Sequence, residues 1–122
     1  MNITRFSASV EAVMGLVLIV DPALVASLLL GTELSAGGQA VGRVAGFALV
    51  ALALACWPQI EPPNGNPSPA VRGLLVYNTF AAIFFIYVGS RREFAGLLLW
   101  PAAALHAVLA ICFARIFFRG GL

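Results

Sequence analysis

The sequence contains no lysine, and charged residues of every kind are scarce. Of its 122 residues, 10% are charged, whereas a typical soluble domain carries about 25%. So few charges cannot cover a surface that faces water, which excludes a soluble enzyme, and their scarcity also excludes a charge-rich disordered chain. The arginines are scattered along the chain and form no basic face, so a nucleic-acid-binding domain is excluded as well.

The sequence also has little of the two residue types that most often bind metals or exchange thiols. Its single histidine, His106, lacks further ligands of suitable type, so we expect no metal site and no haem or other cofactor. Its two cysteines, Cys56 and Cys112, form no Cys-x-x-Cys pair, which argues against a thiol-exchange enzyme. We interpret both cysteines as small apolar residues.

Apolar residues dominate the sequence: 61% are hydrophobic, and the mean hydropathy is +1.00. A helix needs about 20 mostly apolar residues to cross the hydrocarbon core of a membrane. Four segments meet this requirement, at about 3–20, 39–57, 71–88 and 94–118. Backbone groups in lipid must be bonded within their own segment, so each crossing must be helical. The sequence therefore predicts an all-α fold, a membrane-spanning four-helix antiparallel bundle, in a single domain over residues 1–122.

Two interruptions divide these apolar segments. Asp21 and Pro22 follow the first segment, and Asp at the N-cap with Pro at the first helical position begins a new helix, so we predict a short helix at 23–30. The stretch 59–70 is rich in proline and predicts a water-exposed loop. The first segment could be mistaken for a signal peptide. Because Glu11 interrupts its apolar run and no small-residue cleavage motif closes it, we interpret it as a retained helix.

Short connections make consecutive helices antiparallel neighbours, which places both termini on one side of the membrane. The positive-inside rule assigns the arginine-rich side to the cytoplasm. More arginines lie near the terminal side than near the other, namely Arg5, Arg72, Arg115 and Arg119 against Arg91 and Arg92. We therefore expect an integral protein of the cell (inner) membrane with cytoplasmic termini. A dual-topology dimer is the alternative, because it gives a similarly weak bias.

Two stripes of small residues predict close helix packing. Small residues at a spacing of three or four allow two helix backbones to approach in a membrane. The second span carries Gly38, Gly42 and Gly46, and the fourth carries Ala103, Ala107, Ala110 and Ala114. The simpler interpretation is that both stripes hold the monomer's own bundle together. The alternative is that one stripe docks a second copy, giving a homo-oligomer, or another subunit of a larger membrane complex.

Polar side chains inside a membrane are costly and by default indicate a function. With a helical rise of about 1.5 Å per residue, Glu11 and Asn78 lie roughly 10–12 Å below the terminal side, and His106 lies roughly 14–16 Å from either surface. Arg43 lies roughly 9 Å below the opposite surface, and its long side chain could reach towards Glu11. The sequence therefore predicts an inward-facing ligand or proton site made of Glu11, Arg43, Tyr77, Asn78 and His106.

A purely structural interpretation of these residues stays open. In it, Glu11 and Arg43 form an interhelical ion pair, and Asn78 and His106 are hydrogen-bonded to backbone. Such bonds contribute only about 0.6 kcal/mol each in membranes, so they would hold helices together without any further role.

The sequence carries no complete catalytic constellation, so we expect a non-enzymatic membrane protein. The leading hypothesis is an accessory or assembly subunit of a membrane redox complex, or a binder of a lipophilic small molecule such as a quinone, with membrane lipid around it and no nucleic-acid partner. Two alternatives use the polar residues. One is a proton-coupled small transporter that relies on Glu11, and the other is an intramembrane isomerase or cyclase with Glu11 and His106 as acid and base.

The chain resembles the small four-helix bacterial membrane proteins of the DoxX-like kind. The resemblance rests on Gly15 followed by Asp21 and Pro22, on the run Gly-Arg-Val-Ala-Gly at 42–46, and on Leu-Trp-Pro at 99–101 with His106. It implies a four-helix bundle that in some members is an accessory subunit of a membrane redox system. It implies no catalytic residue.

The chain is also similar to the small multidrug resistance family in length, in helix number and in a glutamate on the first helix, here Glu11. In that family the resemblance implies alternate binding of a proton and a cationic substrate at the glutamate. The sequence departs from the family in its proline-rich stretch at 59–70, in the break at Asp21 and Pro22, and in Arg43, which is available to neutralise Glu11.

Overall fold

The computed structural model describes residues 2–57 and 67–119, and these residues form helices and no strand. The helices are α1 (Ile3–Val20), α2 (Pro22–Leu30), α3 (Ala36–Cys56), α4 (Pro69–Ser90) and α5 (Leu99–Arg119). All but α2 are long and apolar enough to cross a membrane. The predicted all-α fold with four membrane-spanning helices is therefore confirmed, and the chain is a small integral membrane protein.

Side chains bond the free backbone N–H groups where several of these helices begin. The Asp21 carboxylate accepts a hydrogen bond from the Leu24 N–H at 3.0 Å and starts α2 directly after α1. The hydroxyl groups of Ser35 and Ser68 accept bonds from the third residues of α3 and α4, at 3.0 and 3.3 Å. Gly31 ends α2 with a φ of 65°, a left-handed conformation that glycine adopts without strain. These caps satisfy backbone groups that helix ends leave free.

The last span is predicted at 94–118, whereas α5 begins about one turn later, because the residues before it pair with α2. The N–H groups of Ala95 and Leu98 donate to carbonyl oxygens near the end of α2, at 3.2 and 2.8 Å. Gly96 lies between them, where an added Cβ would overlap the backbone of Leu29. The residues between α4 and α5 are therefore hydrogen-bonded to α2 and do not form a first turn of α5. The predicted proline-rich loop lies largely outside the described residues.

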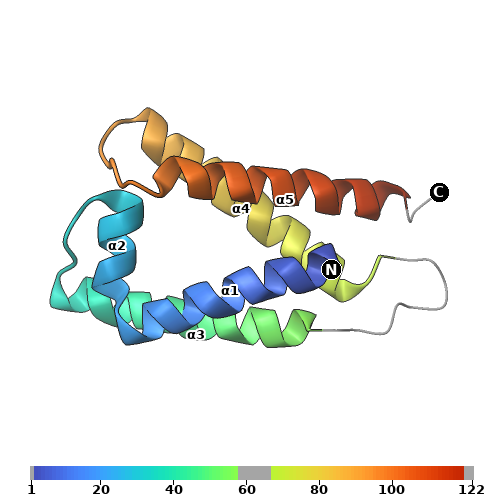
Figure 1. The fold of residues 1–122 in the computed structure, drawn as a ribbon, viewed down its shortest axis with the longest axis horizontal. Coiled ribbons are helices and arrows are strands. Elements are labelled where there is room, and N and C mark those ends of the chain that lie inside the picture. Colours follow the sequence, from blue (N-terminus) through green and yellow to red (C-terminus); the bar gives the residue numbers. More distant parts are fainter. Residues whose placement is uncertain (1, 58–66, 120–122) are drawn as a thin grey trace.

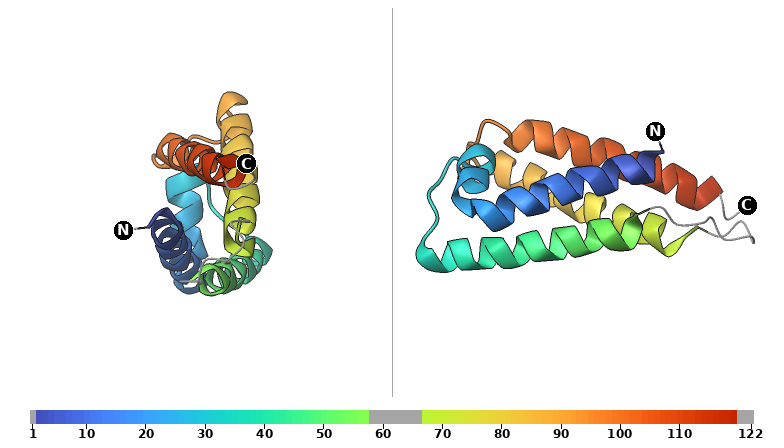
Figure 2. Two further views of the ribbon diagram at one scale, coloured as in Figure 1. Left: turned by 90° about the vertical axis from the view of Figure 1, so that its right-hand side faces the viewer. Right: turned by 60° about the horizontal axis from the view of Figure 1, so that its bottom comes forward.

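The long helices pair two by two (Figure 1). α1 lies along α3, and α5 lies along α4. The start of α1, the end of α3, the start of α4 and the end of α5 are found at the same end, as an antiparallel order requires (Figure 2). At the opposite end the two pairs diverge, and α2 lies between them in contact with α1, α3 and α5. Which end faces the cytoplasm stays a prediction.

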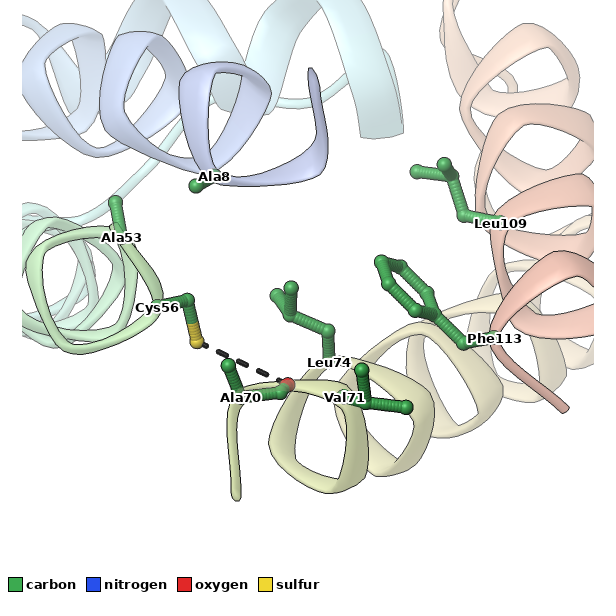
Figure 3. Packing of buried hydrophobic residues seen from close by; sticks show 8 residues of the cluster. All are labelled: Ala8, Ala53, Cys56, Ala70, Val71, Leu74, Leu109 and Phe113. Atoms are coloured by element: carbon green, nitrogen blue, oxygen red, sulfur yellow. Dashed lines mark hydrogen bonds between the residues drawn. The ribbon is translucent and has the colours of Figure 1, made fainter. Parts of the chain in front are cut away.

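The apolar core lies where all four long helices converge (Figure 3). Ala8 of α1, Cys56 of α3, Leu74 of α4 and Phe113 of α5 meet there, and none is more than 3% exposed. The Cys56 thiol points to the carbonyl oxygen of Ala70, 4.0 Å away. The side chains from α1 and α3 are small, so the large side chains of α4 and α5 fill the centre. The described helices are therefore closely packed at this end of the bundle.

Two of the three glycines in the stripe of α3 pack against other helices of the same chain. A Cβ added at Gly46 would lie 2.6 Å from the carbonyl oxygen of Gly15, and one added at Gly42 would lie 2.7 Å from the Cβ of Pro22. These contacts support the simpler interpretation of this stripe. In the alanine stripe of α5, Ala103 is buried and the other three alanines are half-buried. Docking of a second copy on either stripe stays a prediction.

Candidate functional site

Four of the five polar residues predicted as a site lie together, one turn further into the bundle than the apolar core. Glu11, Asn78 and His106 are 1%, 0% and 8% exposed, and Tyr77 is half-buried. A fifth residue, Ser7, is fully buried with them. We call Ser7, Glu11, Tyr77, Asn78 and His106 the polar layer. It draws on α1, α4 and α5.

Glu11 is the least satisfied member of the polar layer. Its Oε1 atom is buried and has no hydrogen-bond partner. The Tyr77 hydroxyl group lies beside the carboxyl group, within reach to donate a hydrogen bond to it. A buried carboxylate without a cation is costly in an apolar medium. The site therefore lacks a proton or a hydrogen-bond donor at Oε1.

Asn78 links three helices through hydrogen bonds. Its Nδ2 group donates to the carbonyl oxygen of Leu74 at 2.8 Å and to the Ser7 hydroxyl at 3.4 Å. Its Oδ1 atom lies 2.8 Å from Nδ1 of His106. Both Nδ2 bonds use amide hydrogens, so the amide orientation is set and Oδ1 is left as the acceptor that faces the imidazole.

Two aromatic rings flank the imidazole of His106. The Tyr77 ring meets it edge-on, with 5.7 Å between ring centroids and an angle of 82°. The Phe85 ring lies at the same centroid distance, tilted by 34°. These contacts hold the imidazole in place, and Tyr77 connects the two halves of the polar layer because its hydroxyl group faces Glu11.

Arg43 departs from the predicted cluster. Its side chain is exposed, and its Nε atom donates to the carbonyl oxygen of Ile19 at 3.2 Å. The reason is the register between α1 and α3, which the contact of Gly15 with Gly46 fixes. This register places Arg43 beside Ile19, roughly 12 Å along α1 from Glu11 at about 1.5 Å per residue. Among the described residues, Glu11 thus has no cationic partner.

An apolar cleft of about 470 Å³ opens where the helix pairs diverge. Every residue that lines it is apolar or glycine, and α2, α3 and α4 supply all but one of the helical ones. They are Leu18, Pro22, Val25, Ala26, Leu29, Leu30, Leu34, Gly37, Gly38, Val41, Gly42, Ala45, Phe84 and Phe85. Small-molecule sites in proteins have about this volume and are mostly apolar.

The cleft and the polar layer are adjacent. Phe85 lines the cleft and also packs against His106. On α1, Leu18 lines the cleft about two turns beyond Glu11, on the same side of the helix as the buried Gly15. Along the bundle, the order is therefore the apolar core, the polar layer and then the cleft.

Reasoning from the sequence missed two residues of this region. Ser7 is one helical turn from Glu11 and therefore on the same face, which was the signal for it. Phe85 is the second, and no sequence signal pairs it with His106. The described residues contain no group of three His, Cys, Asp or Glu side chains that could hold a metal ion.

Comparison with known protein families, with curated proteins and with solved structures finds no match to this chain. The resemblance to DoxX-like proteins and the role in a membrane redox complex therefore stay predictions.

Proposed function

We propose that this membrane protein binds one lipophilic small molecule in the cleft between α2, α3 and α4. The observation that carries the proposal is the cleft itself, with its volume of about 470 Å³ and its wholly apolar lining. A space of this size suits a prenyl or acyl chain and is too small for a further helix, whose diameter with side chains is about 10–12 Å.

The position of α2 supports a permanent cleft. α2 lies between the diverging helix pairs, and the bonds from Ala95 and Leu98 tie its end to the connection before α5. The pairs cannot close on each other while α2 keeps this place. In a bilayer such a gap is filled by an apolar molecule, because a void forfeits the van der Waals contacts of its lining.

The glycine contacts favour a small molecule over a second copy of the chain. Gly42 and Gly46 are the residues best suited to a close helix–helix interface in a membrane, and both already contact α1 or α2 of the same chain. Gly38 and Gly42 form part of the cleft wall, together with larger side chains such as Phe84.

The test fills the cleft from α3. Ala45 lines the cleft, whereas Ala48 lies one turn along the same helix and does not. Native mass spectrometry of protein extracted in mild detergent is expected to find a retained lipophilic molecule on the wild type and on Ala48→Phe, and to find none on Ala45→Phe. Equal retention by the two variants, or none by the wild type, contradicts the proposal.

A second candidate function is proton-coupled transport through Glu11. The observation that favours it is the buried Oε1 atom without a partner, on a carboxyl group that Arg43 does not neutralise. The test uses vesicles with a trapped pH dye and the lipophilic cation tetraphenylphosphonium. Glu11→Gln is expected to abolish proton movement driven by the cation, whereas the exposed Glu33→Gln retains it. Equal proton movement in Glu11→Gln and the wild type refutes this candidate.

A further inference from the structure

The hydrogen bonds of Asn78 fix the tautomer of His106. Nδ2 of Asn78 donates to Leu74 and Ser7, so Oδ1 is the atom that faces Nδ1 of His106 at 2.8 Å. An amide oxygen only accepts hydrogen bonds, so Nδ1 must carry the proton. The other nitrogen, Nε2, is therefore an acceptor with a free lone pair in the neutral ring.

Nε2 has no hydrogen-bond partner among the described residues and is not enclosed. No residue of the described chain bonds to it. Of the buried side-chain nitrogen and oxygen atoms described, Glu11 Oε1 is the one without a partner, so the unpartnered Nε2 is not among the enclosed atoms. Asn78 orients the imidazole and leaves Nε2 without a donor from the described residues, so Nε2 is suited to accept a hydrogen bond from a molecule outside the chain.

The cleft is adjacent to the imidazole that carries this acceptor. Phe85 forms part of the cleft wall and lies against the imidazole, with 5.7 Å between the ring centroids. The two unsatisfied atoms of the polar layer, Nε2 of His106 and Oε1 of Glu11, both require a hydrogen-bond donor.

We infer that His106 recognises the polar end of the molecule in the cleft, and that this end is a hydroxyl group. The ligand class is a lipophilic alcohol or phenol whose O–H donates to Nε2 while its chain lies in the cleft. Asn78 is a positioning residue, because it acts through the imidazole. The inference rests on the proposed function and adds the chemistry of the ligand, which must carry a hydrogen-bond donor. A ketone, an ether or a carboxylate has no such donor.

The experiment compares two probes that differ in one hydrogen-bond donor. Para-dodecylphenol and its methyl ether have the same ring and chain, but the ether cannot donate. Binding to the purified protein in detergent is measured by competition against a fluorescent fatty-chain probe. The phenol is expected to bind about fivefold tighter than the ether, the ratio that one net hydrogen bond confers. In His106→Phe, which keeps an aromatic ring, the two probes are expected to bind equally.

A spectroscopic readout tests the positioning role of Asn78. The chain has one histidine, so ¹⁵N spectra of histidine-labelled protein, purified without a histidine tag, report on His106 alone. The wild type is expected to show the Nδ1-protonated tautomer and a shift of Nε2 when the phenol is added. Asn78→Leu is expected to lose that tautomer and the fivefold preference together. A wild-type ring protonated at Nε2, or no shift with the phenol, overturns the inference.

The two proposals fail in different ways. If both probes bind equally to the wild type and Ala45→Phe excludes both, the cleft binds a lipophilic molecule and the inference about His106 is refuted. If neither probe binds, or Ala45→Phe binds both as the wild type does, the proposed function is refuted and the inference falls with it. A preference for the phenol that survives in His106→Phe refutes the role of the imidazole alone.

Discussion

Replacing Gly46 by alanine tests whether α1 and α3 touch through their backbones. The added Cβ would lie 2.6 Å from the carbonyl oxygen of Gly15 and 2.9 Å from Cγ1 of Ile19. Neither neighbour can yield freely, because one is helix backbone and the other is held by the same crossing. α1 must therefore move away from α3, and the contacts along the whole crossing loosen.

The expected magnitude follows from two opposing effects. Overpacking at a well-packed contact costs about 1–3 kcal/mol, and replacing glycine by alanine in a helix interior contributes about 1 kcal/mol of stability in the other direction. We expect Gly46→Ala to lower the free energy of unfolding by up to about 2 kcal/mol. The same substitution at Gly73 in α4 meets only Cδ1 of Leu52, at 4.0 Å, so it is expected to raise that free energy by about 0.5–1 kcal/mol.

The buried thiol of Cys56 supplies the assay. It is 3% exposed in the core, so a thiol-reactive dye labels it when the bundle opens, and a Cys112→Ala background makes that signal specific. Labelling during thermal unfolding is expected to begin at a lower temperature in Gly46→Ala and at a higher one in Gly73→Ala. If labelling begins at a higher temperature in both variants, helix propensity alone decides, and the close α1–α3 contact is refuted.

Three further substitutions test the polar layer and α2. Glu11→Met keeps a similar side-chain shape and removes a buried acceptor without a partner, so it is expected to raise the free energy of unfolding by about 1–3 kcal/mol. Lower stability in the same thiol assay would show that the carboxyl group is satisfied. Asn78→Leu is expected to lower the free energy of unfolding by about 1 kcal/mol, because the neighbouring imidazole loses its acceptor. An unchanged midpoint temperature of unfolding would contradict the 2.8 Å bond between the two side chains. Gly96→Ala is expected to speed amide hydrogen exchange at Ala95, because its Cβ overlaps Leu29; exchange at the wild-type rate would refute the contact with α2.

The membrane spans and the depth of the polar layer follow from the sequence. Apolar runs long enough to cross lipid have one structural solution, the helix, and the fixed rise per residue converts position into depth. Counting along the helices therefore places Asn78 and His106 at one level, and in the structure they lie 2.8 Å apart. The start of α2 is equally legible, because Asp21 and Pro22 are residues that begin helices.

Depth alone does not say which way a side chain points. Arg43 has small neighbours on its own helix, as Glu11 does, and counting along the helices allows the two to meet. What separates them is the register of the α1–α3 crossing, which depends on Gly15 and Gly46 meeting at one point. A contact between two residues far apart in the sequence has no local signal, so the sequence-based reasoning could not decide it.

The cleft results from the break between α1 and α2 at Asp21 and Pro22, which the sequence predicts. Pro22 ends α1 and lets α2 turn across the bundle, where its wall residues and its bonds to Ala95 and Leu98 keep the helix pairs apart. On the other side of the polar layer, no described segment is inserted and the helices close around Phe113. The polar layer thus lies between the apolar core and the opening that α2 creates, and Phe85 is the residue that contacts both His106 and the cleft. The order core, polar layer, cleft therefore follows from where the first helix is broken.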